Sequence, residues 1–204
     1  MFITFEGLDG SGKTTQFQRA VIWLRGRGQD ILTLREPGGT RIGDQIREVL
    51  HNRTYTEMTA RAELLLYAAS RAQLVSERIQ PYLEAGGMVL CDRFSDSTMA
   101  YQGYARGLDL GFLDTLIQFA TQGIRPDLTL YLDIEPAEGV RRRQQGQGEL
   151  TRLDVEKIDF HTKVREGYRA LIAKEPERWV IINASKSIDE VAIQVRAALE
   201  TRLK

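Results

Sequence analysis

Short apolar runs recur along the chain, and longer segments with the period of an α-helix separate them. Runs of strand-forming residues occur at 2–5, 30–35, 88–91, 128–132 and 179–182. Each is rich in the aliphatic and aromatic residues that strands favour. Apolar strands that alternate with helices predict an α/β fold, with a five-stranded, parallel, doubly wound sheet flanked by helices.

The segments between the strands repeat their apolar residues every three to four positions, as amphipathic helices do. We expect helices around 17–24, 42–50, 57–85, 97–102, 109–121, 136–145, 154–174 and from residue 187 onward. Gly86 and Gly87 should end the longest helix, whereas Gly103 and Gly107 should interrupt the one near residue 97.

Two helices carry specific predictions about their apolar residues. The helix at 42–50 places its apolar residues on one face, namely Ile42, Ile46, Val49 and Leu50. The last helix begins with a predicted capping box of Ser187 and Glu190. Its inward residues should be Ile188, Val191, Val195 and Leu199. Because no repeat or linker divides the chain, residues 1–204 are expected to form a single domain.

Composition narrows the classes of function. The 204 residues suit one α/β domain, and 28 Lys and Arg balance 28 Asp and Glu. A chain of zero net charge has no overall attraction to nucleic acid or membrane, so the cations that matter must be local. Cys91 is the single cysteine, which excludes an internal disulfide and suits the cytoplasm. No apolar run reaches the roughly 18 residues of a membrane span, and no signal peptide pattern precedes the first strand.

The strand at 2–5 leads into Gly7-Leu8-Asp9-Gly10-Ser11-Gly12-Lys13-Thr14, which has the spacing of a phosphate-binding P-loop. Its glycines allow positive φ, so that backbone N–H groups can point at phosphate oxygens. Lys13 should reach the outer phosphates, and the Thr14 hydroxyl can bind Mg²⁺. The helix that follows directs its positive end at the same anion.

Two further stretches stand at carboxyl ends of strands, where doubly wound sheets bind ligands. They are Arg35-Glu36-Pro37 and Asp92-Arg93. A P-loop by itself fits a kinase with a small acceptor or a switch or motor that hydrolyses a nucleotide. The Asn-Lys-x-Asp motif of GTPase switches is missing, because Asn52 and Asn183 are the only asparagines and neither fits it. The kinase is therefore favoured.

The chain resembles the thymidylate kinase family over nearly its whole length. The resemblance is carried by the P-loop stretch 5–15 and by 35–40, 68–71, 92–94, 100–103 and 126–133. It implies a P-loop kinase fold and a homodimer. It also implies transfer of the γ-phosphoryl group of ATP to dTMP with Mg²⁺, for dTTP synthesis. Another nucleotide or small-metabolite kinase and a hydrolytic switch remain the alternatives.

An acceptor that is itself a phosphate needs cations more than a general base. Because its second pKa is about 6, it is largely a dianion at neutral pH, and repulsion between two polyanions is the main obstacle. Arg93 is the first candidate to bind it, because a guanidinium can hold two oxygens at once. An ion pair with Asp92 or another carboxylate is the alternative. The resemblance agrees with Arg93 and places Asp92 in the magnesium shell through water.

Arg47 and Arg35 are second candidates for the acceptor phosphate. For Arg47 an exposed ion pair with Asp44 or Glu48 is a serious alternative. The resemblance implies that Arg47 reaches the phosphate, and that the bond before Pro37 is cis.

Base recognition should come from the long helix and the segment 92–102. Arg71 lies on an otherwise apolar stripe, where it needs a partner, so an interhelical salt bridge is the alternative to a ligand. The resemblance implies that Arg71 donates to thymine O4, with Ser70 and Gln102 near the base. Tyr67 stands where many relatives have a stacking Phe, and Tyr101 matches a residue that favours deoxyribose. The remaining acceptor contacts that the resemblance implies are Asp9, Glu36, Ser97 and Thr98.

A basic segment after the fourth strand is the candidate lid. It contains Arg141, Arg142, Arg143, Gly146, Gly148 and Arg152. Such a run is often only a solvated helix face. The P-loop itself has no arginine, and family members of that kind supply the cation from the lid. We expect residues 136–153 to close over the site and bring Arg142 or Arg152 onto the transferring phosphoryl group.

Overall fold

The central strand of the sheet is the one that leads into the P-loop. In the computed structural model, which describes residues 1–146 and 150–203, β1 (Phe2–Gly7) lies between β3 (Met88–Asp92) and β4 (Leu128–Asp133). β2 (Ile31–Arg35) and β5 (Trp179–Asn183) form the edges, giving the order β2-β3-β1-β4-β5 with every pair parallel. The predicted five-stranded parallel sheet is confirmed, and each strand lies within two residues of its expected position.

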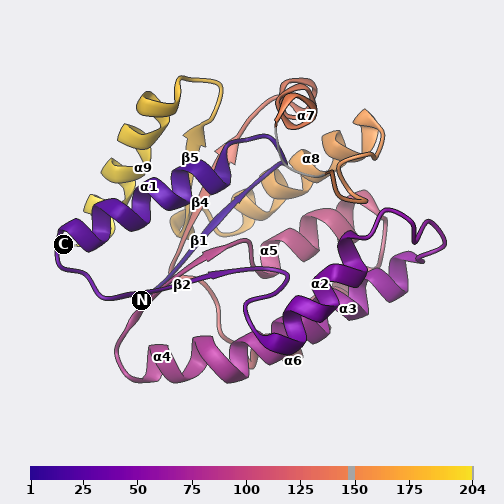
Figure 1. Cartoon of the computed structure of the whole chain (residues 1–204), viewed down its shortest axis with the longest axis horizontal. Helices are drawn as coiled ribbons and strands as arrows, with labels where there is room; N and C mark the ends of the chain where they lie inside the picture. Colours follow the sequence, from indigo (N-terminus) through magenta and orange to yellow (C-terminus); the bar gives the residue numbers. More distant parts are fainter. Residues whose placement is uncertain (147–149, 204) are drawn as a thin grey trace.

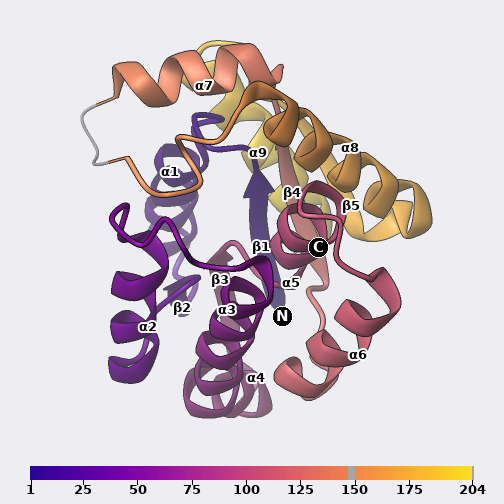
Figure 2. The same ribbon diagram turned by 90° about the vertical axis from the view of Figure 1, so that its right-hand side faces the viewer.

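Helices cover both faces of the sheet. Figure 1 shows the last helix beside the first on one face, and α4, α5 and α8 on the other. The helical segments are α1 (Lys13–Gly26), α2 (Arg41–His51), α3 (Ala60–Leu74), α4 (Gln80–Glu84), α5 (Ser95–Thr98), α6 (Leu110–Thr121), α7 (Pro136–Gln145), α8 (Ile158–Lys174) and α9 (Ile188–Arg202), with π-helical turns η1 (Val75–Ile79) and η2 (Met99–Ala105) and a 3-10 turn η3 (Pro176–Arg178). In Figure 2 the arrow of β1 points toward α7, so the helix of the predicted lid lies at the carboxyl end of the sheet.

The core holds β1 from both sides. Ile3 and Phe5 pack in a large apolar cluster that includes Leu24 of α1. Phe2, whose side chain points the other way, packs in a second cluster with Leu74. Each fully buried side chain of this size stabilises the fold by roughly 1.5–3 kcal/mol. The P-loop therefore begins from a strand that is packed on both faces.

The long helix predicted at 57–85 is present with two differences. It begins at Ala60, where Thr59 Oγ1 accepts from the N–H of Ala62 at 3.3 Å. Its middle, η1, has π-helical geometry before it continues as α4. Pro81 lies just beyond that turn, and a proline ring clashes with the carbonyl four residues earlier in a regular α-helix. The wider turn gives the ring room.

The expected break at Gly103 is wrong. The helix runs through it to Ala105 and ends before Gly107, whose φ is +75°. A Cβ at position 103 would lie 2.6 Å from Leu110 Cδ2, so the glycine allows η2 and α6 to approach closely. Its role is packing and not chain reversal.

Helix boundaries and faces differ from expectation elsewhere too. α8 begins at Ile158 and not at 154, and the preceding turn is closed by Asp154, which accepts from the N–H of Thr151 at 2.6 Å. The capping box at Ser187 is confirmed. Ile188, however, was expected to point inward and is exposed. Ile42 and Val49, which were expected on the apolar face of α2, are exposed as well.

Candidate active site

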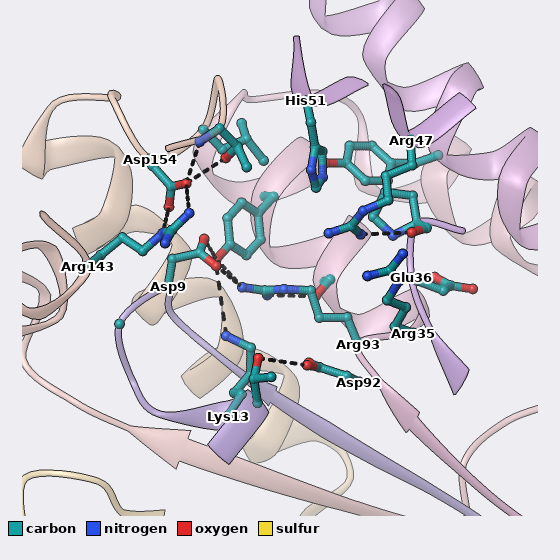
Figure 3. Close-up of a pocket in the computed structure, with 18 of the residues that line it drawn as sticks. Asp9, Lys13, Arg35, Glu36, Arg47, His51, Asp92, Arg93, Arg143 and Asp154 are labelled. Atoms are coloured by element: carbon teal, nitrogen blue, oxygen red, sulfur yellow. Dashed lines mark hydrogen bonds and ion pairs between the residues drawn. The ribbon is translucent and has the colours of Figure 1, made fainter. Parts of the chain in front are cut away.

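A pocket of about 520 Å³ lies where β1, β2 and β3 end. This is the size of a cavity that holds one or two small ligands. Its walls come from the P-loop, the loop after β2, α2, α3, the segment after β3, and the chain around α7. Figure 3 shows Arg35, Arg47 and Arg93 on one side and Asp9, Lys13 and Arg143 on the other, around a common space.

The P-loop has the predicted backbone. Gly7, Gly10 and Gly12 have φ of +144°, +80° and +86°. Lys13 Nζ donates to the carbonyl of Leu8 at 2.9 Å, so the loop holds its own cation. Burial, with the nearby charge of Arg93, lowers the pKa of Lys13 to about 8.

The P-loop touches α7 through two glycines. A Cβ at Gly10 would lie 2.0 Å from the carbonyl oxygen of Gly139 in α7, and one at Gly139 would lie 3.0 Å from that of Asp9. Because these are backbone contacts, no rotamer change could relieve a larger residue at Gly10. α7 is therefore seated directly on the loop that would bind the donor phosphates.

Thr14 and Asp92 form the only candidate magnesium position that the described residues suggest. Thr14 Oγ1 donates to Asp92 Oδ2 at 3.2 Å, joining the start of α1 to the end of β3. No group of three or more His, Cys, Asp or Glu within residues 1–146 and 150–203 could hold a metal by itself. One hydroxyl and one carboxylate suit Mg²⁺, which takes its other ligands from water and substrate phosphates.

Arg93 occupies the centre of the site. Its Nη2 donates to Asp9 Oδ1 at 2.6 Å and to the Tyr101 hydroxyl at 3.2 Å, and its Nη1 donates to Ser97 Oγ at 3.1 Å. The guanidinium also stacks on the Tyr101 ring, 5.1 Å from its centroid. Although burial alone would lower it, the Asp9 carboxylate raises the pKa of Arg93. In return, Arg93 and Lys13 hold the pKa of Asp9 well below its ordinary range, against the effect of burial.

The backbone of Arg93 is strained, because its φ is +71°. A non-glycine residue in that region costs about 1–3 kcal/mol and persists only where its surroundings hold it. Two hydrogen bonds do so. The N–H of Arg93 donates to the carbonyl of Phe5 at 3.0 Å, and the next N–H, of Phe94, donates to Glu6 Oε1 at 2.8 Å.

Glu6 is a fully buried carboxyl beneath Arg93. Ser97 Oγ and the Tyr168 hydroxyl donate to its Oε2 at 2.6 and 2.7 Å. Burial raises the pKa of Glu6 to about 7, although Arg93 opposes the shift. Through Ser97, Tyr168 and the peptide of Phe94, Glu6 fixes both the side chain and the backbone of Arg93.

Arg71 has the salt bridge that a buried arginine requires, and it still lines the pocket. Its Nε and Nη2 both bind the Glu36 carboxylate, with Nη2 2.6 Å from Oε2. Nη1 donates to Thr98 Oγ1 at 2.9 Å. Glu36 was predicted as an acceptor contact, and here its carboxylate is committed to Arg71. The bond between Glu36 and Pro37 is cis, as expected.

Two more cations and a histidine border the same pocket. Arg47 Nη1 donates to the carbonyl of Pro37 at 2.9 Å, and the surface pairs considered for it are not formed in the described chain. Arg35 lies 3.9 Å from Asp44. Burial and the nearby Arg47 lower the pKa of His51 to about 4, so its ring is neutral at physiological pH.

The arginines of the predicted lid divide between two sides. Arg142 and Arg143 line the pocket, where Arg142 pairs with Glu138 at 2.6 Å and Arg143 with Asp154 at 2.9 Å. Arg152 instead reaches α3 and donates to Glu63. Gly148, a predicted hinge, lies outside the described residues.

The comparisons with known proteins agree with this geometry. A model of the thymidylate kinase family matches residues 5–195. The chain belongs to the thymidylate kinase family. It is 49% identical to the thymidylate kinase of Roseiflexus sp. strain RS-1, over 100% of this chain and 95% of that protein. It is 50% identical to the thymidylate kinase of Geobacillus thermodenitrificans, over 100% of this chain and 91% of that one.

The structure leads to the same family. The crystal structure of thymidylate kinase from Ehrlichia chaffeensis matches with a TM-score of 0.79 and 32% identity, covering 98% of both chains. The predicted P-loop kinase fold is thereby confirmed.

Within this thymidylate kinase fold, most predicted residues meet in the pocket. Those that line it are Asp9, Gly10, Gly12, Lys13, Thr14, Glu36, Arg47, Tyr67, Arg71, Asp92, Arg93, Ser97, Thr98, Tyr101, Gln102 and Arg142. Five predicted residues do not line it: Gly7, Leu8, Ser11, Ser70 and Arg152. The first three form the inner side of the P-loop. Ser70 Oγ instead accepts from the N–H of Gly38 at 3.0 Å.

Sequence reasoning missed several contributors. Arg143, His51 and Asp154 line the pocket but were not chosen as site residues. Arg143 belongs to the basic run, so its position beside Arg142 was a usable signal. No motif in the local sequence marks His51 or Asp154, although Arg47 and Thr151, which line the same pocket, lie within four residues of them.

The buried Glu6 predicts a particular dependence of stability on pH. Folded Glu6 keeps its proton up to about pH 7, whereas the ordinary value is 4.5. The folded state therefore binds more protons in that interval, and the free energy of unfolding falls as pH rises through it, by up to about 3 kcal/mol. Glu6→Gln, which cannot ionise, should lose less stability than the parent between about pH 5 and about pH 8 in urea unfolding.

The matched control is Glu48→Gln, which removes an exposed carboxyl on α2. It should follow the parent at both pH values. Equal losses of stability in Glu6→Gln and the parent would contradict the assignment.

Proposed function

We propose that this chain transfers the γ-phosphoryl group of ATP to dTMP in this pocket, with Mg²⁺, and releases ADP and dTDP. Its membership of the thymidylate kinase family confirms the predicted activity. One observation supports this site above all others. Lys13 Nζ, on the donor side, and Arg93 Nη2, on the acceptor side, lie 3.9 and 2.6 Å from the same oxygen, Asp9 Oδ1. Phosphates bound by the two cations would meet there.

The donor side follows from the P-loop. Its N–H groups and the start of α1 bind the phosphates of ATP, and Lys13 leaves the Leu8 carbonyl to contact the outer ones. Thr14 and Asp92 would hold Mg²⁺, which supplies positive charge that neutralises the β- and γ-phosphates. The contact between Gly10 and Gly139 keeps α7 close to this end of ATP.

On the acceptor side, Arg93 and Arg47 bind the dTMP phosphate. As a dianion it attacks without a general base, so the residues need only to place it in line and offset its charge. Tyr101 packs against Arg93 where the sugar would lie, and Arg71, Gln102 and Tyr67 border the space for the base. No hydroxyl partner of Tyr67 occurs among the described residues, so its ring is free to stack on the base.

An acceptor panel tests the function. Protein, Mg²⁺ and ATP are mixed with each nucleoside monophosphate in turn, and ADP is followed. We expect rapid ADP formation with dTMP. A different preferred acceptor would support another kinase of this fold. ADP formation at the same rate with and without an acceptor would support a hydrolytic switch.

Arg93→Lys is the control that ties the reaction to this pocket. It keeps the charge and loses the two-oxygen contact, so kcat/KM for dTMP should fall about 100-fold while KM for ATP changes little. Unchanged kcat/KM would place the acceptor elsewhere.

We also propose that residues 1–204 act as one kinase domain whose lid, at about 136–153, supplies a catalytic arginine. Arg142 is the first candidate because it lines the pocket. Arg152 would have to leave Glu63 to reach a phosphate, so we expect it to act mainly on acceptor binding.

For the lid, we expect Arg142→Ala to lower kcat by about 100-fold or more, since an arginine on the transferring group contributes strongly. Arg152→Ala should chiefly raise KM for dTMP. Arg141→Ala is the matched control. Arg141 also pairs with Glu138, but it points outside the pocket, so its loss should leave steady-state kinetics nearly unchanged. Unchanged turnover in both Arg142→Ala and Arg152→Ala would rule out the lid role.

We propose that the protein is a homodimer through α2, α3 and α6, which contact one another in that order. Exposed apolar side chains gather on these helices, namely Ile42, Val49, Leu65, Phe112 and Phe119. Phe119 is 81% exposed, and covering such side chains would favour association.

Sedimentation should give a dimer for the parent and a monomer for Phe119→Asp. Ile193→Asp serves as the control, because Ile193 is also exposed but lies on α9, across the sheet. A parent that sediments as a monomer would contradict the proposal.

We place the protein in the cytoplasm, which the single, buried and unpaired Cys91 supports. Among the helices of the described residues, none has the length and apolarity to cross a membrane.

A further inference from the structure

Gln102 lies in the wall of the pocket, and one buried hydrogen bond holds its amide. Its Nε2 donates to Glu63 Oε1, on α3, at 2.8 Å. Both residues are almost completely buried. The bond therefore ties the Gln102 amide to a residue that does not itself line the pocket.

Glu63 is ionised in this position. Nε and Nη2 of Arg106 both donate to it at 3.3 Å, and Arg152 donates to its Oε2. Although burial alone would raise it, the hydrogen bonds from Gln102 and Arg152 lower the pKa of Glu63. A carboxylate has acceptor atoms only. The Gln102 atom that faces Glu63 must therefore be the amide nitrogen.

The orientation of the Gln102 amide has a consequence for the pocket. With Nε2 held by Glu63, the carbonyl oxygen is turned away from it. Oε1 has no hydrogen-bond partner within the described part of the chain, and Gln102 lines the pocket. The residue thus offers the acceptor Oε1 to a ligand, while Nε2, which has one further hydrogen, is held beside Glu63.

Arg71 offers a donor in the same pocket. Its Nε and Nη2 bind Glu36, and Nη1 donates one hydrogen to Thr98 Oγ1. Nη1 carries two hydrogens. One N–H of Arg71 therefore has no partner in residues 1–146 and 150–203.

A donor and an acceptor together match one kind of pyrimidine edge. Thymine and uracil present a carbonyl oxygen next to a ring N–H, which satisfies both groups. Cytosine presents an amino donor next to an unprotonated ring nitrogen, which opposes both. Unsatisfied polar groups in a buried site are costly, so this pattern can discriminate strongly.

We propose that Glu63 is a specificity-determining residue, which selects pyrimidines with a keto edge over cytosine by fixing the direction of the Gln102 amide. Glu63 does not touch the acceptor and acts through Gln102, as a positioning residue. The inference rests on the proposed function, since it takes the acceptor base to bind against Arg71 and Gln102.

The test compares dTMP with dCMP in the full chain. Glu63→Gln places an amide opposite Gln102 that can donate or accept, so the Gln102 side chain can turn over. We expect the ratio of kcat/KM for dTMP to kcat/KM for dCMP to fall about 10-fold or more, with KM for ATP unchanged. The ratio is measured on one preparation, so it does not depend on how much of the variant folds.

Arg106→Met is the matched control. It disturbs the same buried cluster but leaves the bond between Glu63 and Gln102 in place, so the ratio should stay at the parental value. The double variant Glu63→Gln with Gln102→Ala tests whether Glu63 acts through Gln102. The Glu63 substitution should have no further effect on the ratio once Gln102 is absent.

An unchanged ratio in Glu63→Gln would overturn the proposal, as would an equal fall in Arg106→Met. If Glu63→Gln yields no folded protein, Gln102→Ala decides, because an unchanged ratio in that variant removes Gln102 from base selection. Failure of the parent to phosphorylate dTMP would instead refute the proposed function itself.

Discussion

Cations that must meet two phosphates have to be held close together before any phosphate arrives, and this constraint shapes the site. Two like charges 4 Å apart repel by about 4 kcal/mol near a protein surface. The fold offsets this with carboxylates from other segments. Asp9 serves both Arg93 and Lys13, Asp154 serves Arg143, and Glu138 serves Arg142. The chain has zero net charge, but its pocket therefore contains several ion pairs.

The parts of the site that the sequence predicted well are local ones. The P-loop lies between a buried strand and a helix in the first 26 residues, and its spacing alone determines which groups face an anion. Arg93 follows directly after a strand, so its place at the carboxyl edge of the sheet follows from the topology. The five strands were found for the same reason, since each is short, apolar and bounded by helices.

The parts of the site that the sequence did not predict depend on partners far away in the chain or on the direction in which a side chain points. Glu6 contacts residues 91 and 162 positions away, and Glu63 contacts one that is 89 away. No local pattern marks such pairs. Arg142 and Arg152 also look alike in sequence, yet Arg142 lines the pocket and Arg152 bonds to Glu63 on α3. The prediction for Gly103 was wrong for a different reason. Sequence alone does not distinguish a glycine that allows close packing from one that interrupts a helix.

The burial of each ion pair separates those that a substrate can exchange from those that must persist. The side chains of Arg71 and Glu36 are 2% and 3% exposed, whereas those of Arg93 and Asp9 are 16% and 29% exposed. Removing one partner of a fully buried pair leaves an uncompensated charge in a medium that solvates it poorly. Arg71 must therefore keep Glu36 while it binds, and contributes only its spare N–H. Arg93 and Asp9 are more accessible to water, so a phosphate can compete with Asp9 for the guanidinium. In the proposed function, base recognition therefore rests on rigid pairs and phosphate binding on exchangeable ones.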